Sequence, residues 1–180
     1  MGRIRSTGGF WLLMGALLLA APLSLVAWTL LACTVHELGH LLAIRLLGGQ
    51  VEELRLTGLG GVMIPQGTFG YGAECLVALA GPAASLVLAL LTAPFCQTLA
   101  GVSLVLGLFN LLPLAPLDGG RVLGAVVSRL AGPDAGEKVG RWITRGAALA
   151  LTGLGLWVVF RGGSFTLLLF AVVFLVFAQM

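Results

Sequence analysis

The sequence is short of charged side chains, which make up only 9% of its 180 residues. A soluble globular domain carries about 25% charged residues, so this chain lacks the polar surface that water requires. Its ten basic residues lie in short loops between apolar runs and form no single patch, which argues against a nucleic-acid partner. With 59% hydrophobic residues, the chain belongs in a lipid bilayer.

Cysteine is also scarce, and the three cysteines do not suggest disulfide pairs. Cys33, Cys75 and Cys96 are odd in number and irregular in spacing. Each lies in or beside an apolar run, where a free cysteine behaves as a small hydrophobic residue. We therefore expect no disulfide framework.

Apolar runs that are long enough to cross a bilayer recur along the chain. A span needs about 20 apolar residues. Residues 1–27 resemble a signal peptide, but their removal would leave the next run without a partner, so we expect a retained first span. The fold class predicted is an all-α polytopic membrane protein with about six transmembrane helices. The six expected spans are residues 9–26, 28–47, 74–93, 95–112, 139–160 and 164–179.

The basic residues predict the orientation of these spans. If the N-terminus is cytoplasmic, only Arg161 lies on the far side of the membrane. The remaining nine basic residues then lie at cytoplasmic ends: Arg3, Arg5, Arg45, Arg55, Arg121, Arg129, Lys138, Arg141 and Arg145. This asymmetry follows the positive-inside rule and predicts that both termini are cytoplasmic.

Two stretches do not read as simple spans. Between spans 2 and 3, the β-prone pieces Val51–Leu56 and Val62–Ile64 flank a glycine-rich turn, which predicts a small membrane-associated β-hairpin. Residues 110–121, "NLLPLAPLDGGR", contain two prolines that would break a helix. Unwound backbone at membrane depth is tolerated only where protein or a watery cavity shelters it. We expect residues 122–137 to form a short, partly polar connector.

The motif "HELGH" in the second span carries the strongest chemical signal. In this H-E-x-x-H pattern, helical spacing puts His36 and His40 on one face, one turn apart, where both can reach one metal ion. Glu37 lies about 100° around the helix, within reach of a metal-bound water. The alternative is an ordinary helix face, but a charge at the bilayer centre costs at least ~2.5–3.5 kcal/mol. The pattern therefore predicts a catalytic metal site.

Catalytic zinc usually takes three protein ligands, so a third ligand is needed. Asp118 follows the broken end of the fourth span and has an adjacent backbone break that could aim it, although Asp-Gly is also common in turns. Glu74 begins the third span, where it would more readily cap the helix and face headgroups. Cys33 lies near His36, but one helix supplying all three ligands would be cramped. We favour Asp118.

At this point a family resemblance becomes clear. "HELGH" and "NLLPLAPLDGG" resemble the two metal motifs of the site-2 protease family of intramembrane zinc metalloproteases, and the plan of six spans resembles its stage IV sporulation protein FB group. "AGPAASLVLA", residues 80–89, resembles the stretch of the intervening span, with Ser85 where many members have Asn. We assign this stretch only a packing role between spans. The likeness covers most of residues 28–130.

The resemblance implies one zinc ion per chain, with His36, His40 and Asp118 as its ligands. It implies that Glu37 is the catalytic acid and base, and that Asn110 helps to bind substrate or the oxyanion. Asn110 could instead be a hydrogen-bonded helix-packing residue. The hairpin would pair with an unwound substrate by β-augmentation, although it could also be a plain cytoplasmic loop.

We therefore expect residues 1–180 to form a single transmembrane metalloprotease domain with no soluble accessory domain. It would sit in the bacterial cytoplasmic membrane and cleave a membrane-tethered protein near the cytoplasmic side. By family analogy alone, the substrate would be a pro-sigma factor in sporulation, and a membrane regulatory partner could act on the site. The rival classes are a metal-ion transporter and an inactive scaffold of the same fold. The intact Glu37 argues against both, because neither needs an acid and base beside the metal.

Overall fold

The computed structural model describes residues 3–57 and 60–162. The chain divides into two compact units, Met1–Leu111 and Leu112–Met180, and each is described by itself. The described residues are mostly helical, with one small sheet in the first unit. Among the described residues, three helices are long and apolar enough to cross a membrane: α2, Leu23–Leu46; α3, Tyr71–Thr92; and α6, Pro133–Phe160.

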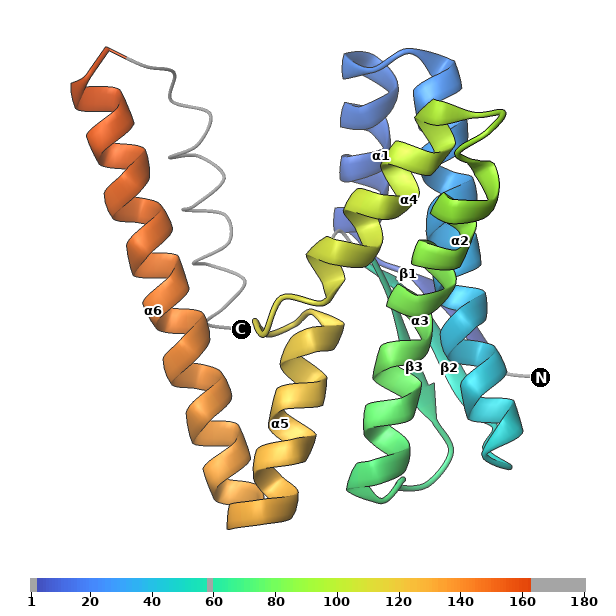
Figure 1. Ribbon diagram of the computed structural model, residues 1–180, viewed down its shortest axis with the longest axis vertical. Coiled ribbons are helices and arrows are strands. Elements are labelled where there is room, and N and C mark those ends of the chain that lie inside the picture. Colours follow the sequence, from blue (N-terminus) through green and yellow to red (C-terminus); the bar gives the residue numbers. More distant parts are fainter. Residues whose placement is uncertain (1–2, 58–59, 163–180) are drawn as a thin grey trace. The chain divides into compact units, whose positions relative to one another are not determined.

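Four helices form most of the first unit. In addition to α2 and α3, they are α1, Gly8–Ala20, and α4, Gln97–Asn110. The chain breaks between α1 and α2 at Ala21 and Pro22, because the residue before a proline is pushed out of the helical region. Figure 1 shows α2, α3 and α4 side by side.

The number of spans is only partly as predicted. Helices α1 and α4 are apolar but have 13 and 14 residues, fewer than the roughly 20 that a full crossing needs. The break at Pro22 shortens the first expected span. The expected span at 164–179 lies outside the described residues. Six transmembrane helices are therefore not confirmed, whereas the described residues contain three helices that are long and apolar enough to cross a membrane.

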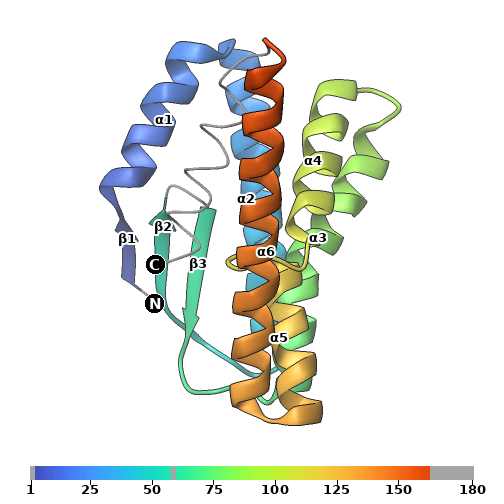
Figure 2. The same cartoon turned by 90° about the vertical axis from the view of Figure 1, so that its left-hand side faces the viewer.

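A three-stranded sheet accompanies these helices. The strands are β1, Arg3–Ser6; β2, Val51–Thr57; and β3, Gly60–Pro65. β2 and β3 form the predicted antiparallel hairpin, and β1 adds to β2 in parallel. We did not predict β1, because its four residues are too few for a clear alternation. Figure 2 shows the order β1-β2-β3, with β3 on the side of α2.

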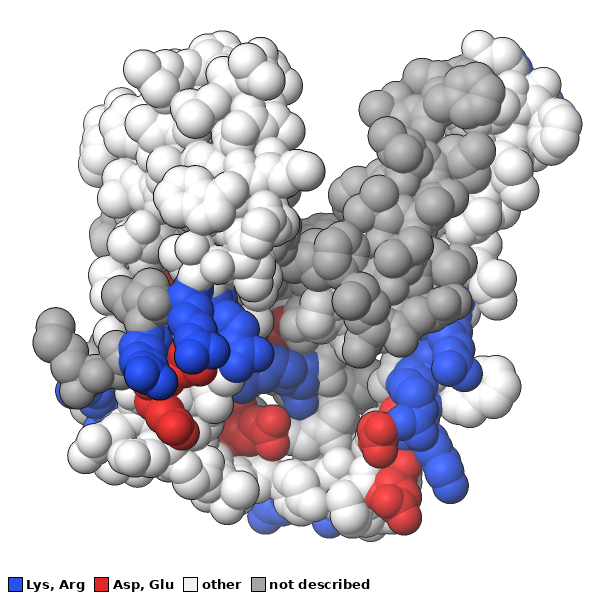
Figure 3. Space-filling view, turned by 180° about the vertical axis from the view of Figure 1, so that it is seen from behind, with Lys and Arg blue, Asp and Glu red and all other residues white. Residues whose placement is uncertain are grey.

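Charged side chains of the first unit gather at the sheet. The Glu53 carboxylate lies 2.9 Å from Arg55 Nε and 3.9 Å from Arg5 Nε. The hydrogen bond from Arg55 is the main reason why the pKa of Glu53 lies below its usual value. Figure 3 shows basic and acidic side chains gathered together on the first unit, next to a part of that unit whose surface is uncharged. That separation suits a unit with one part in lipid and another at headgroup level.

The second unit contains a helical hairpin. Helix α5, Asp118–Ala131, is followed directly by α6. Gly132 supplies the turn with a φ of +92°, and Pro133 starts α6 at a position where its missing N–H costs nothing. The prediction of a connector at 122–137 was therefore wrong. Residues 122–131 belong to α5, which is an amphipathic helix rather than a loop, and residues 133–137 form the start of α6.

Candidate metal centre

Helix α2 brings the three residues of the H-E-x-x-H motif together. His36 and His40 are buried, and Glu37 is half-buried. The two Nε2 atoms lie 3.2 Å apart and face each other. Two nitrogen ligands at about 2.0–2.1 Å from a tetrahedral zinc ion are separated by roughly 3.3 Å. The histidine pair therefore fits one shared zinc ion.

The other nitrogen of each ring is held by helix α3. His36 Nδ1 lies 2.9 Å from Ser85 Oγ, and His40 Nδ1 lies 2.7 Å from the carbonyl oxygen of Val77. A carbonyl can only accept, so His40 Nδ1 carries the proton and its Nε2 presents a lone pair. Metal-ligating histidines typically have their second nitrogen held in this way.

Glycines let α3 come close enough to make these contacts. A Cβ on Gly81 would clash with the His40 ring and would lie 2.8 Å from His36 Nε2. A Cβ on Gly39 would lie 2.6 Å from the backbone oxygen of Ala80. Either methyl group would push the two helices apart. The "AGPAAS" stretch therefore touches the histidines, and our expectation of a packing role alone was too narrow.

Glu37 contacts the sheet. The backbone N–H of Gly61 in β3 donates to Glu37 Oε1 at 3.3 Å. A Cβ on Gly61 would lie 2.7 Å from the carboxylate carbon, so only glycine fits here without a shift. The hairpin thus approaches the carboxylate with its backbone rather than with side chains. This gives β3 a position beside the expected acid and base.

In the second unit, Asp118 is buried in the first turn of α5. Arg121 lies 3.6 Å from its carboxylate, one turn along the helix. The loop before α5 packs tightly on Gly120, where a Cβ would come too close to Leu114. Thr144 Oγ1 of α6 accepts a hydrogen bond from the Ala115 N–H at 3.0 Å. The broken segment is therefore an ordered turn that sets the start of α5.

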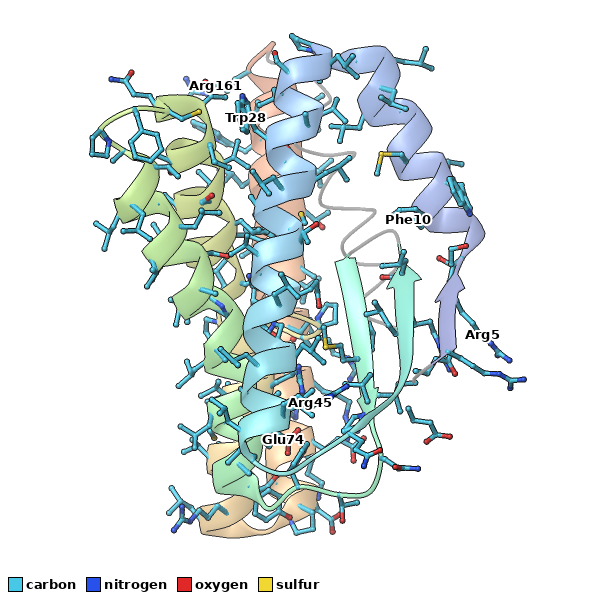
Figure 4. The ribbon with its side chains drawn as sticks, turned by 90° about the vertical axis from the view of Figure 1, so that its right-hand side faces the viewer. Arg5, Phe10, Trp28, Arg45, Glu74 and Arg161 are labelled. Atoms are coloured by element: carbon cyan, nitrogen blue, oxygen red, sulfur yellow. The ribbon has the colours of Figure 1, made fainter. Side chains whose placement is uncertain are left out.

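The remaining candidates are Asn110, Cys33 and Glu74. Asn110 is the last residue of α4, and its side-chain amide donates to the Leu106 carbonyl of its own helix at 3.0 Å. Cys33 is exposed, unlike the buried histidines. Glu74 lies in the first turn of α3. Figure 4 shows Glu74 and Arg45 at the same end of their helices, so Glu74 is placed as a helix-end residue.

Several supporting residues escaped sequence reasoning. Ser85, Gly61 and the Val77 carbonyl touch the motif from segments 24 to 49 positions away. A backbone carbonyl leaves no signal in a sequence. The only available hint was Ser85, a hydroxyl within an apolar span at a position where the family resemblance suggests a polar residue.

Comparisons with known proteins show which sequences and family this chain resembles. The family model described as peptidase family M50 matches residues 92–154. Zinc metalloprotease MJ0392 of Methanocaldococcus jannaschii is 31% identical over 135 residues, covering 68% of this chain and 40% of that protein. Rip3 of Mycobacterium tuberculosis, also named as a zinc metalloprotease, is 37% identical over 174 residues, covering 86% of this chain and 42% of Rip3.

A solved structure shares the fold. The site-2 protease from Methanocaldococcus jannaschii superposes with a TM-score of 0.76 and 24% identity, over 98% of this chain and 88% of that one. The chain spans about two fifths of the length of the curated relatives it matches. Together, the family model, the relatives and the fold support peptidase family M50 and a zinc metalloprotease of the site-2 type.

Proposed function

We propose that this chain is an intramembrane zinc protease that hydrolyses peptide bonds of membrane-tethered proteins. The observation that carries the proposal is the buried histidine pair, with its Nε2 atoms 3.2 Å apart, next to Glu37 on an apolar helix. Buried ionisable groups in a membrane span are costly and are kept where they have a function. His36 and His40 supply two zinc ligands, and we assign the third to Asp118. The whole chain, residues 1–180, then acts as one catalytic domain.

In the reaction, bound zinc supplies Lewis-acid chemistry that lowers the pKa of water to about 7 and polarises the scissile carbonyl. Glu37 removes a proton from the attacking water and then delivers it to the nitrogen of the leaving amine. The Gly61 N–H holds one carboxylate oxygen, which fixes the orientation of Glu37. We assign Asn110 to the developing oxyanion, which requires its amide to leave the Leu106 carbonyl.

Strand β3 is proposed to receive the substrate. A transmembrane helix hides its peptide bonds in its own hydrogen bonds, so it must unwind before cleavage. In the described part of the chain, β3 is an edge of the sheet, and its Gly61 lies against Glu37. An extended substrate that pairs with this edge would lie beside the acid and base.

The proposed protease activity also leads to a proposal for the location of the chain and for its substrate. We place the chain in a bacterial cytoplasmic membrane with both termini in the cytoplasm, which the distribution of basic residues supports. Cleavage would then occur toward the cytoplasm. A pro-sigma factor of sporulation is one candidate substrate, and a membrane partner could regulate access; both rest on family analogy.

The central test is Glu37→Gln, assayed by co-expression with tagged membrane-tethered substrates. Loss of the acid and base should slow cleavage by about 10²–10⁴-fold, while zinc stays bound because Glu37 is no ligand. Glu137→Gln, the same chemical change at an exposed residue of α6, should cleave like the parent. If Glu37→Gln binds zinc and still cleaves at the parent's rate, the proposal that the chain is a protease is wrong.

The same variants separate the rival classes. A metal-ion transporter would move zinc into proteoliposomes, and this flux would not depend on Glu37. An inactive scaffold would bind zinc through His36 and His40 but would cleave no substrate in either form. A zinc count on Asp118→Ala tests the third ligand, and undiminished tight binding would shift that role to Cys33 or Glu74.

A further inference from the structure

Helix α3 presents three groups to the histidine pair at positions spaced by four. These are the Val77 carbonyl, the bare Cα of Gly81 and the Ser85 hydroxyl. We propose that Ser85 is a positioning residue for the metal site: its hydroxyl accepts a hydrogen bond from His36 Nδ1 and keeps the Nε2 lone pair of His36 directed at zinc. This inference rests on the proposed zinc site. It assigns Ser85 a role in orienting the His36 ring, in addition to packing between the helices.

The two histidines are held by partners of different kinds. The Val77 carbonyl is backbone and only accepts, so it fixes the tautomer of His40 whatever side chain stands at that position. The partner of His36 is the Ser85 Oγ, a side-chain atom that can both donate and accept a hydrogen bond. The second ring nitrogen of His36 therefore depends on a side chain, and a single substitution can remove that partner.

Burial makes this contact consequential. Ser85 has no exposed surface, and His36 is only 5% exposed, so water cannot readily replace the hydroxyl. Without Oγ, His36 would lose its hydrogen bond with Ser85 in a buried setting. The imidazole could then carry its proton on Nε2, the nitrogen that zinc requires. Loss of such a supporting partner typically weakens metal binding by about 10–100-fold.

The chain offers a matched control for packing. Ser103 on α4 is also fully buried, and its Oγ has no hydrogen-bond partner among the described residues. Ser103→Ala also removes a buried hydroxyl oxygen, but it removes no hydrogen bond to a histidine. A role of Ser85 in packing alone predicts that Ser85→Ala and Ser103→Ala behave alike.

The experiment measures metal binding rather than cleavage. Zinc affinity is determined by chelator competition on the full chain in nanodiscs, and the absorption bands of the cobalt-substituted protein report ligand geometry. We expect Ser85→Ala to bind zinc about 10–100-fold more weakly, with shifted cobalt bands, and Ser103→Ala to match the parent. Ser85→Thr, which keeps the hydroxyl, should restore most of the affinity.

Two results would overturn this role for Ser85. One is zinc affinity of Ser85→Ala within twofold of the parent, with unchanged cobalt bands; the other is an equal loss in both alanine variants. If metal-free Ser85→Ala does not fold, Ser85→Thr becomes the deciding variant. A zinc affinity of Ser85→Thr more than tenfold below that of the parent would then refute the role. His36→Ala separates the two proposals: if it still binds zinc as the parent does, the proposed zinc site itself fails.

Discussion

At the residue scale, two glycines show how a missing side chain shapes the site. Gly39 on α2 and Gly81 on α3 each occupy a place where a methyl group would collide with the facing helix. Small residues at such positions let membrane helices approach closely, because packing rather than hydrophobic burial holds them together in lipid. The hydrogen bonds from α3 to both histidine rings depend on that short separation.

Replacement of Gly81 should therefore disrupt the histidine pair directly. Gly81→Ala places a Cβ against the His40 ring and 2.8 Å from His36 Nε2, so we expect zinc affinity to fall at least about tenfold. The measurement is chelator competition on the purified protein. Gly101→Ala on α4 is the control, because a Cβ there meets nothing within 4 Å. Equal zinc affinity in both variants would contradict this account.

At the scale of elements, strand β3 has one edge paired with β2 and another edge that faces away from β2. Along an antiparallel strand, successive residues point their N–H and C=O groups alternately toward the partner strand and away from it. The Gly61 N–H donates to Glu37, away from β2, so the backbone groups of Met63 also point away and those of Val62 point toward β2. Met63 is thus the next backbone position that a substrate strand could use.

A proline scan tests that edge. Met63→Pro removes one outward N–H and leaves the ladder with β2 intact, as proline is tolerated on sheet edges. One lost hydrogen bond is worth about 0.5–1.5 kcal/mol, so we expect kcat/KM to fall about three- to tenfold with little change in thermal stability. Val62→Pro should instead lower the Tm, because its N–H faces β2. Unchanged kcat/KM for Met63→Pro would remove β3 from substrate binding.

At the scale of the whole molecule, the chain keeps much apolar surface on its outside. Leu19 is 92% exposed and Phe160 is 87% exposed, and many other large apolar side chains are similar. In water such a surface would aggregate, whereas lipid solvates it. Folding in this environment depends less on a hydrophobic core and more on close packing and on buried polar contacts such as those around the histidines.

Zinc should stabilise the folded protein, because the unfolded chain does not bring His36 and His40 together. Metal at 1,000 times its Kd adds about 4 kcal/mol to the free energy of unfolding. We expect a chelator to lower the Tm of the detergent-solubilised parent by several degrees, and to leave the Tm of His36→Ala unchanged. Thermal unfolding with and without chelator makes the comparison. An equal shift in both proteins would show that the chelator acts elsewhere.

Much of this protein could be read from its sequence because the signals are local. The spacing of four between His36 and His40 places them on one helix face, and a helix fixes that relation without reference to the rest of the chain. The same holds for the hairpin, where two β-prone runs flank a glycine-rich turn. Low charge and long apolar runs placed the chain in lipid. These features depend on neighbours within about one turn or one hairpin.

Other features depended on contacts between distant segments. The polar residues of 122–137 suggested a connector, and only packing against α6 reveals why α5 is a helix there. The pairing of β1 with β2 joins residues about 50 positions apart, and the four residues of β1 are too few to predict it from the sequence. Ser85 and the Val77 carbonyl reach the histidines only because Gly39 and Gly81 let α3 lie against α2. The sequence by itself determined the membrane setting and the spacing of the two histidines and Glu37. The tertiary structure decided which groups hold the two histidine rings in place. Those groups lie far away in the sequence, and only the packing of α3 against α2 brings them near.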